Sequence, residues 1–159
     1  MTSPPARRPS VRLNADEAWD VLTRAHIGIF TTLRRDGWPI ALPVWFVVID
    51  RRIYISTRGK KVSRVRHDDR CSFLVERGEA WAELEAVHLT GTATVVDDSE
   101  LLHRVADALD AKYASFRPAR RQMGEDTRTF YERQRRSVIE IVPDERLLSW
   151  DNRRAAPTS

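Results

Sequence analysis

The fold is decided by residues 27–57, which read IGIFTTLRRDGWPIALPVWFVVIDRRIYIST. This stretch contains three runs rich in β-branched and aromatic residues, at 27–33, 38–49 and 53–57, and such runs are typical of strands. Two short polar segments separate them, and the first contains Asp36-Gly37, a pair that supports the positive φ values of a tight hairpin. Short connections join antiparallel strands, so the stretch predicts an antiparallel meander.

Helical patterns flank this meander. Asn14 followed by Glu17 has the spacing of a capping box, and apolar residues at helical spacing follow it up to Gly28, where the helix is expected to have ended. A short basic helix is predicted at 59–67. A longer helix, capped by Asp97-Asp98-Ser99, is predicted to carry one apolar side up to Phe116.

Further strands are predicted after the meander, at 70–76, within the extended region 81–96, and at 138–142. Strands and helices do not alternate in the order typical of a parallel sheet. The sequence therefore predicts a mainly β fold, an antiparallel barrel of about six strands with flanking helices.

Charge is unevenly distributed along the 159 residues. Lys and Arg number 27 against 23 Asp and Glu, a formal net charge of +4. The excess lies in residues 1–12 and in an Arg-rich segment at 117–136, whereas 13–116 carry slightly more acidic than basic residues. A nucleic-acid-binding domain needs a basic face on the folded module, so this distribution disfavours a nucleic-acid partner.

Composition and length predict one soluble, cytoplasmic domain. We expect a flexible arm at 1–12, a folded domain at 13–151 and a tail at 152–159. No apolar run has the roughly 18–20 residues of a membrane-spanning helix, and the arm lacks the apolar stretch of a secretory signal. Cys71 is the single cysteine and the four histidines are far apart in sequence, so no metal site is predicted.

The stretch with the most chemical information reads STRGKKV, residues 56–62. Two hydroxyl groups end a predicted strand, Gly59 permits a close turn, and Lys60 and Lys61 open a helix. Hydroxyl donors, a helix N-terminus and cationic side chains together are suited to binding phosphate. A solvated charged turn explains the same pattern equally well.

A second stretch of interest is Pro43-Val44-Trp45-Phe46. Pro43 has no N–H to donate to a ladder, so its strand is expected at an edge or with a bulge there. A bulge would free backbone groups to contact a planar ligand, with Trp45 or Phe46 as a wall. The alternative is an ordinary aromatic core with a proline at the barrel rim.

Taken in order, these stretches resemble the pyridoxamine 5′-phosphate oxidase-like split-barrel proteins, specifically their small flavin and deazaflavin oxidoreductases. The resemblance covers about residues 14–151. The segments that carry it are Ile27-Gly28, Thr31-Thr32, Asp36-Gly37, Pro43-Val44-Trp45-Phe46, Ser56-Thr57, Lys61-Val62, Asp68-Asp69-Arg70, Leu89-Thr90-Gly91-Thr92-Ala93, Pro143 and Leu148-Ser149-Trp150-Asp151.

The resemblance implies a six-stranded split β-barrel that forms a homodimer, with a cofactor in a groove at the subunit interface. The backbone at Pro43, Val44, Trp45 and Phe46 would face the heterocycle of the cofactor. The phosphate would be held by Ser56, Thr57, Arg58, Lys60 and Lys61, with Arg64 as a further contact. No acid–base side chain need be recognisable, because the flavin itself accepts and donates hydride.

Two cofactors are used in the family that the chain resembles, FMN and coenzyme F420, a deazaflavin with a phosphate-bearing acidic tail. The strong preference for Arg over Lys suggests a GC-rich genome and favours F420, and the segment 117–136 could hold an acidic tail. The expected function is hydride transfer from reduced F420 to a small molecule. The alternatives are an FMN-dependent enzyme resembling pyridoxamine-phosphate oxidase and a flavin-, haem- or tetrapyrrole-binding protein without turnover.

Overall fold

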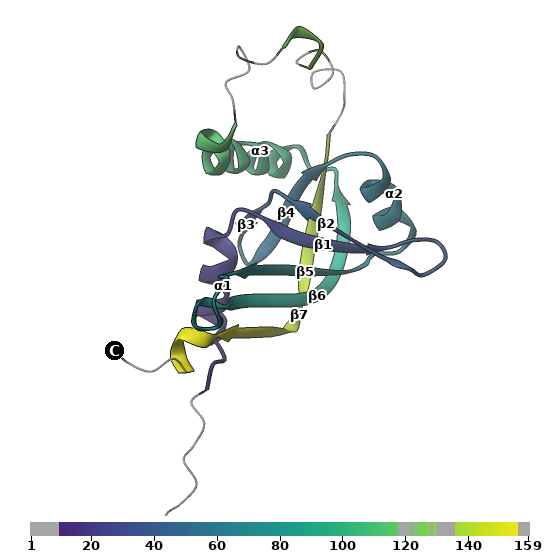
Figure 1. The fold of residues 1–159 in the computed structure, drawn as a ribbon. Coiled ribbons are helices and arrows are strands. Elements are labelled where there is room, and N and C mark those ends of the chain that lie inside the picture. The colour runs from purple at the N-terminus through teal and green to yellow at the C-terminus, as the bar shows by residue number, and fades with distance from the viewer. Residues whose placement is uncertain (1–9, 118–121, 123, 128, 130–135, 156–159) are drawn as a thin grey trace, which may run out of the picture.

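One curled antiparallel sheet with helices around it forms the molecule (Figure 1). The computed structural model describes residues 10–117, 122, 124–127, 129 and 136–155. The strands in these ranges have the order β2-β1-β5-β6-β7-β4-β3. The expected mainly β split-barrel class is thereby confirmed. The strands are β1 (Gly28–Leu33), β2 (Pro39–Val44), β3 (Val47–Ile49), β4 (Arg52–Thr57), β5 (Arg70–Arg77), β6 (Glu85–Val96) and β7 (Ser137–Asp151).

Both tight turns of the meander contain residues with positive φ values. Gly37 has a φ of 84° in the β1–β2 turn, and Asp50 and Arg51 have φ values of 51° and 56° between β3 and β4. Two successive positive φ values match the twist of the flanking strands, as in a type I′ hairpin. These turns set the register in which Ile29 pairs with Pro43 and Ile49 with Arg52.

The predicted strand at 38–49 is wrong in one respect, because it is broken into β2 and β3. The break lies at Trp45 and Phe46, where the chain leaves the β1 ladder and later joins β4. Seven strands therefore replace the expected six in the described ranges. β2 lies at one edge of the sheet, which confirms the edge position predicted from Pro43.

The last strand is longer than predicted. β7 continues past Val142 to Asp151 and pairs with β6 on both sides of a register shift between Leu89 and Gly91. The extended region predicted at 81–96 instead begins with the short 3-10 helix η1 (Trp81–Glu83). β6 and β7 are neighbours at the centre of the strand order, so their ladder joins β2, β1 and β5 on one side to β4 and β3 on the other.

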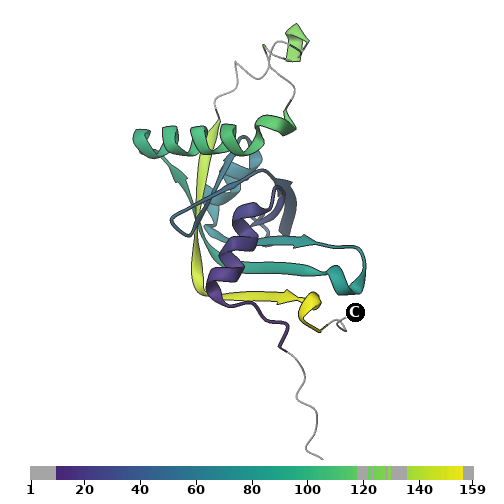
Figure 2. The ribbon, with the colours of Figure 1, turned by 90° about the vertical axis from the view of Figure 1, so that its left-hand side faces the viewer.

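In the ranges that the structure describes, the sheet is flanked by the helices α1 (Ala15–Arg24), α2 (Lys60–His67) and α3 (Ser99–Tyr113). α1 lies across one face of the sheet (Figure 2), and its Ala18, Val21 and Leu22 join a buried core with strand residues such as Phe30 and Phe73. α3 packs over β3 and β4 through a smaller core around Val105 and Leu109. Short 3-10 helices η2 (Ala114–Phe116) and η4 (Asn152–Ala155) follow α3 and β7.

Parts of three predicted segments lie outside the described residues. They are 1–9 of the arm, 156–159 of the tail, and most of the Arg-rich segment 117–136. In the described part of the arm, the Val11 carbonyl accepts a hydrogen bond from the Asp151 N–H. Within the described ranges, no helix is both long and apolar enough to cross a membrane.

Candidate functional site

The segment Pro43–Phe46 forms the corner between β2 and β3. Pro43 is exposed on the edge strand, and Trp45 is 37% exposed. Val44 and Phe46 point into the core, where the Phe46 ring contacts Phe73 edge-on with 4.8 Å between centroids. Only Pro43, Trp45 and the backbone of this corner are therefore placed to meet a ligand.

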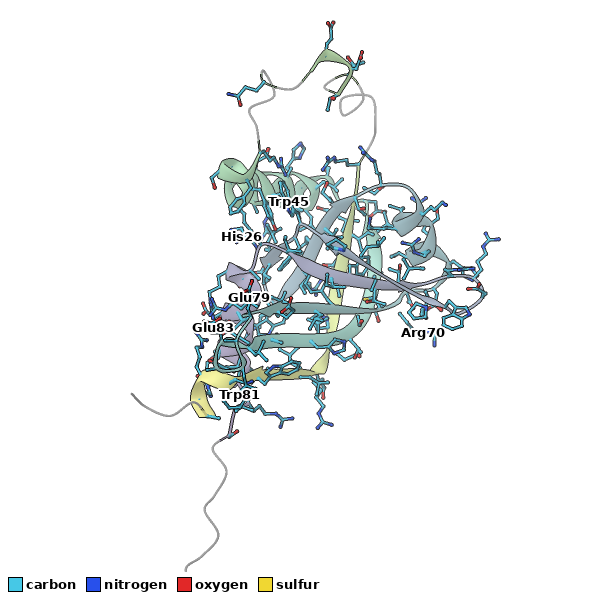
Figure 3. The ribbon with its side chains drawn as sticks, viewed as in Figure 1. His26, Trp45, Arg70, Glu79, Trp81 and Glu83 are labelled. Carbon is cyan, nitrogen blue, oxygen red and sulfur yellow. The ribbon has the colours of Figure 1, made fainter. Side chains whose placement is uncertain are left out.

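Tyr113, at the end of α3, holds this corner in place. Its hydroxyl accepts the Phe46 N–H at 2.9 Å and lies 2.9 and 2.8 Å from the carbonyl oxygens of Phe46 and His26. The Tyr113 ring stacks on Trp45, with centroids 4.3 Å apart and planes 6° from parallel. Figure 3 shows Trp45 and His26 beside α3. The sequence pattern predicted Tyr113 only as an apolar-face residue, since no local signal marks a contact 67 residues away.

Lys112 lies next to Tyr113 and faces the same corner. Its Nζ is buried 4.2 Å from the centroid of the Phe46 ring, with no hydrogen-bond partner among the described residues. Burial disfavours the charged amine and lowers the pKa of Lys112 to about 8. The aromatic ring partly compensates through its negative face.

The turn from β4 into α2 carries the predicted phosphate-binding residues. Ser56 and Thr57 end β4, half-buried and paired with Val138 and Ser137 of β7. Gly59 has a φ of 67° and precedes the helix without a side-chain cap, and no acidic residue lies in the first turn of α2. An uncapped, acid-free helix start leaves N–H donors and the positive end of the dipole available to an anion.

Lys60 and Lys61 lie on different sides of α2, because successive helical residues are about 100° apart. Lys60 lines a cavity of about 520 Å³ together with Ser63, Arg64 and His67 of α2. The opposite wall comes from the β1–β2 hairpin: Leu33, Arg34, Arg35 and Ile40. Of the ten predicted site residues, Lys60 and Arg64 thus share this cavity, and the other eight do not line it.

The cavity is strongly basic. Five of the eight described residues that line it are Arg, Lys or His, and none of the eight is acidic. Arg34 pairs with Asp36 at 2.5 Å, in the turn outside the cavity. Arg64 donates from Nε to the hydroxyl of Thr32 at 2.7 Å, and Thr32 is almost fully buried. This bond orients the Arg64 guanidinium. Its two terminal amino groups make no hydrogen bond to the residues that the structure describes.

Other reactive groups are structural. Burial raises the pKa of the Cys71 thiol to about 12, and its Sγ lies 3.4 Å from the Gly91 carbonyl oxygen. A thiol so rarely ionised is a poor nucleophile. In the described ranges, no three His, Cys, Asp or Glu side chains gather to hold a metal ion.

Comparison with known proteins places these features in a family. The family model described as pyridoxamine 5′-phosphate oxidase matches residues 15–149. No curated protein matches the sequence.

Solved structures with the same fold include the conserved hypothetical protein Rv2991 from Mycobacterium tuberculosis. It is 27% identical, with a TM-score of 0.78 over 99% of this chain and 96% of that one. An FAD binding protein from Mycobacterium smegmatis is 19% identical, with a TM-score of 0.61 over 86% and 95%. A heme binding protein from the same organism is also 19% identical, with a TM-score of 0.64 over 92% and 61%.

Proposed function

We propose a function from one premise: this chain belongs to the pyridoxamine 5′-phosphate oxidase family. The protein binds a phosphate-bearing flavin or deazaflavin and transfers hydride between that cofactor and a small molecule. We favour reduced F420 as the hydride donor, with FMN as the alternative cofactor. Two structural relatives described as binding FAD and heme fit a cofactor-binding role for this fold.

The observation that carries the proposal is the β4–α2 turn. The phosphate would meet the hydroxyl groups of Ser56 and Thr57, the uncapped N–H groups at the start of α2, and Lys61. Arg58, Lys60 and Arg64 would add positive charge from the flanks of the same turn. Because the first turn of α2 has no acidic residue, these residues fit an anion well.

The ring of the cofactor would lie against the β2–β3 corner. β2 is an edge strand in the described sheet, so one side of its backbone has no neighbouring strand. The Phe46 N–H is already taken by Tyr113, which leaves the backbone near Pro43, Val44 and Trp45 for the ring. When bound, the flavin-type ring supplies the hydride chemistry; the residues of this chain orient it and shield it from water.

A homodimer would complete the site, and the outer face of the sheet is suited to form it. One row of residues runs across five strands, each residue paired with the next on the neighbouring strand: Pro43, Ile29, Leu74, His88 and Leu148. Their neighbours along the strands, such as Phe30 and Phe73, are in the core, so this row faces the other way. Leu148 and the nearby Trp150 remain 47% and 40% exposed, an apolar surface that a second copy would cover.

Titration with F420, FMN and FAD, followed by fluorescence, tests the proposal. We expect F420 to bind more tightly than FMN, and the protein to oxidise reduced F420 in the presence of a suitable acceptor. Tight binding with no oxidation across a broad acceptor panel would favour a carrier without turnover. Binding of haem alone, with none of the three flavin-type molecules bound, would contradict the proposed function.

A further inference from the structure

We propose that the basic cavity between the β1–β2 hairpin and α2 is a second anion site, separate from the phosphate site at Lys61. It would hold an additional anionic group of the same ligand, either a second phosphate or a carboxylate. The ligand class is thus a cofactor with a second anionic group beyond its first phosphate, rather than a mononucleotide. The identity of this ligand rests on the proposed function, whereas the anion site itself rests on the cavity alone.

Charge is the first argument. The cavity is surrounded by Arg34, Arg35, Lys60 and Arg64. Among the residues that the structure describes, only Arg34 of these four has a carboxylate partner, Asp36. His67 adds a further group that can carry positive charge. The phosphate monoester of FMN carries about −1.5 to −2 charges at neutral pH, which Lys61, Arg58 and the start of α2 would largely neutralise, with Lys60 and Arg64 between the two sites. The hairpin cations, Arg35 above all, would therefore still lack an anion when a ligand with a single phosphate is bound.

Geometry is the second argument, because the two groups of cations point in different directions. Ser63, Arg64 and His67 continue the helix face that begins at Lys60, and Lys61 lies on the flank of that face. A single small anion at Lys61 would not fill a cavity of about 520 Å³, which lies within the range of organic-ligand pockets, about 300–1,000 Å³. Leu33 and Ile40 give the cavity an apolar wall, which suits an anionic group carried on an organic framework.

Preorganisation is the third argument. The hairpin turn is held by the Gly37 N–H donating to the Arg34 carbonyl at 2.9 Å and by the Trp38 N–H donating to the Asp36 carboxylate at 3.3 Å. Arg64 is held by Thr32. These bonds fix the backbone that carries Arg34 and Arg35 and orient the guanidinium of Arg64, which reduces the conformational freedom lost when an anion binds.

Inorganic pyrophosphate tests the anion site without any flavin. Isothermal titration at low salt should show two classes of site in the native protein. The double variant Arg34→Gln, Arg35→Gln should lose pyrophosphate binding at the cavity and keep binding at Lys61. The variant Lys61→Ala should lose binding at Lys61 and keep binding at the cavity. Arg66→Gln, on α2 but outside the cavity, is the matched control and should keep both. An unchanged titration in the double variant, with the native fold retained by circular dichroism, would overturn the proposal.

Flavin-type ligands then identify the second group. The double variant should weaken FAD or F420 about tenfold, as expected for lost charge-assisted hydrogen bonds on a partly exposed site, and leave FMN within about twofold. If the double variant loses affinity for FAD alone, the group in the cavity is a second phosphate. If it loses affinity for F420 alone, that group is an acidic tail. Equal loss for all three ligands, FMN included, would overturn a separate second site. If none of the three binds the native protein, the proposed function fails while the pyrophosphate result still decides the cavity.

Discussion

The two ends of the sheet use arginine in opposite ways. At one end, where β5 and β7 end and β6 begins, the buried carboxylate of Glu85 forms ion pairs with Arg24 at 3.2 Å, with Arg153 at 2.5 Å and with Arg77. At the α2 end, a cavity is surrounded by Arg34, Arg35, Lys60 and Arg64, and no acid lines it among the residues that the structure describes. We call these regions the paired end and the basic end.

This difference separates stability from binding. A buried carboxylate is costly to desolvate, and the three guanidinium groups at Glu85 offset that cost within the chain itself. Cations at the basic end repel one another, and an incoming anion would relieve that repulsion. Substitutions at the paired end should therefore change folding, whereas those at the basic end should change ligand affinity.

Glu85→Gln should give the largest effect. Removing the charge leaves three Arg residues without their shared partner, and we expect a loss of about 3 kcal/mol in the free energy of unfolding. This value is at the low end for a broken buried ion pair because the Arg side chains are 43–50% exposed. Urea denaturation measures it, with the exposed Glu79→Gln as control. Equal stability of the two variants would contradict the role of the paired end.

Lys61→Ala should leave stability nearly unchanged and weaken a phosphate-bearing cofactor by about 1.5–3 kcal/mol, roughly 10- to 150-fold. The reason is the loss of a charge-assisted hydrogen bond at the start of α2. Fluorescence titration measures the affinity, and Arg66→Ala on the same helix is the control. An affinity equal to that of the native protein would rule out the phosphate assignment.

Acid should weaken the paired end through Asp151. Hydrogen bonds from Arg153 lower the pKa of Asp151 below its ordinary value. The folded protein thus favours the ionised carboxylate, so this stability is present above the unfolded pKa, about 3.9, and is lost as the pH falls through the lower folded value. Asp151→Asn should remove about 1.5 kcal/mol at pH 7 and show less further loss below about pH 4. Urea denaturation at several pH values tests this, and parallel pH profiles would contradict it.

Salt should give the smallest effect on folding and a clear one on binding. Between about 0.05 and 0.5 M salt we expect less than about 0.5 kcal/mol change in stability, because the pairs at Glu85 are partly buried and weakly screened. Affinity for an anionic cofactor should fall over the same range, since the basic end is open to solvent. If salt strongly changed the free energy of unfolding and left the affinity for the cofactor unchanged, the roles given to the paired end and the basic end would be contradicted.

Local signals in the sequence predicted much of the fold. Asn14 and Glu17 form the expected capping box, each side chain bonded to the other's backbone N–H. Gly37 adopts the expected positive φ, and Pro43 lies on an edge strand. Each of these features depends on residues close in sequence, for which turn and cap chemistry is informative.

The missed features depend on distant contacts. The break at Trp45 and Phe46 coincides with bonds to Tyr113, and the far half of β7 is held by pairing with β6. Lys60 and Lys61 are predicted to hold the phosphate together; the helix places them about 100° apart, and their joint role stays a prediction. Neither Arg34 nor Arg35 is among the predicted site residues, because nothing local indicates that α2 lies opposite the hairpin.

Native mass spectrometry of the purified protein tests the central claim, a cofactor whose phosphate is held at Lys61 and the start of α2, most directly. We predict a dimer that retains a flavin or deazaflavin bearing phosphate, and loss of that ligand in Lys61→Ala with the protein still folded. A protein that retains only a ligand without phosphate, such as haem, or that binds the same cofactor equally well after Lys61→Ala, would contradict the account.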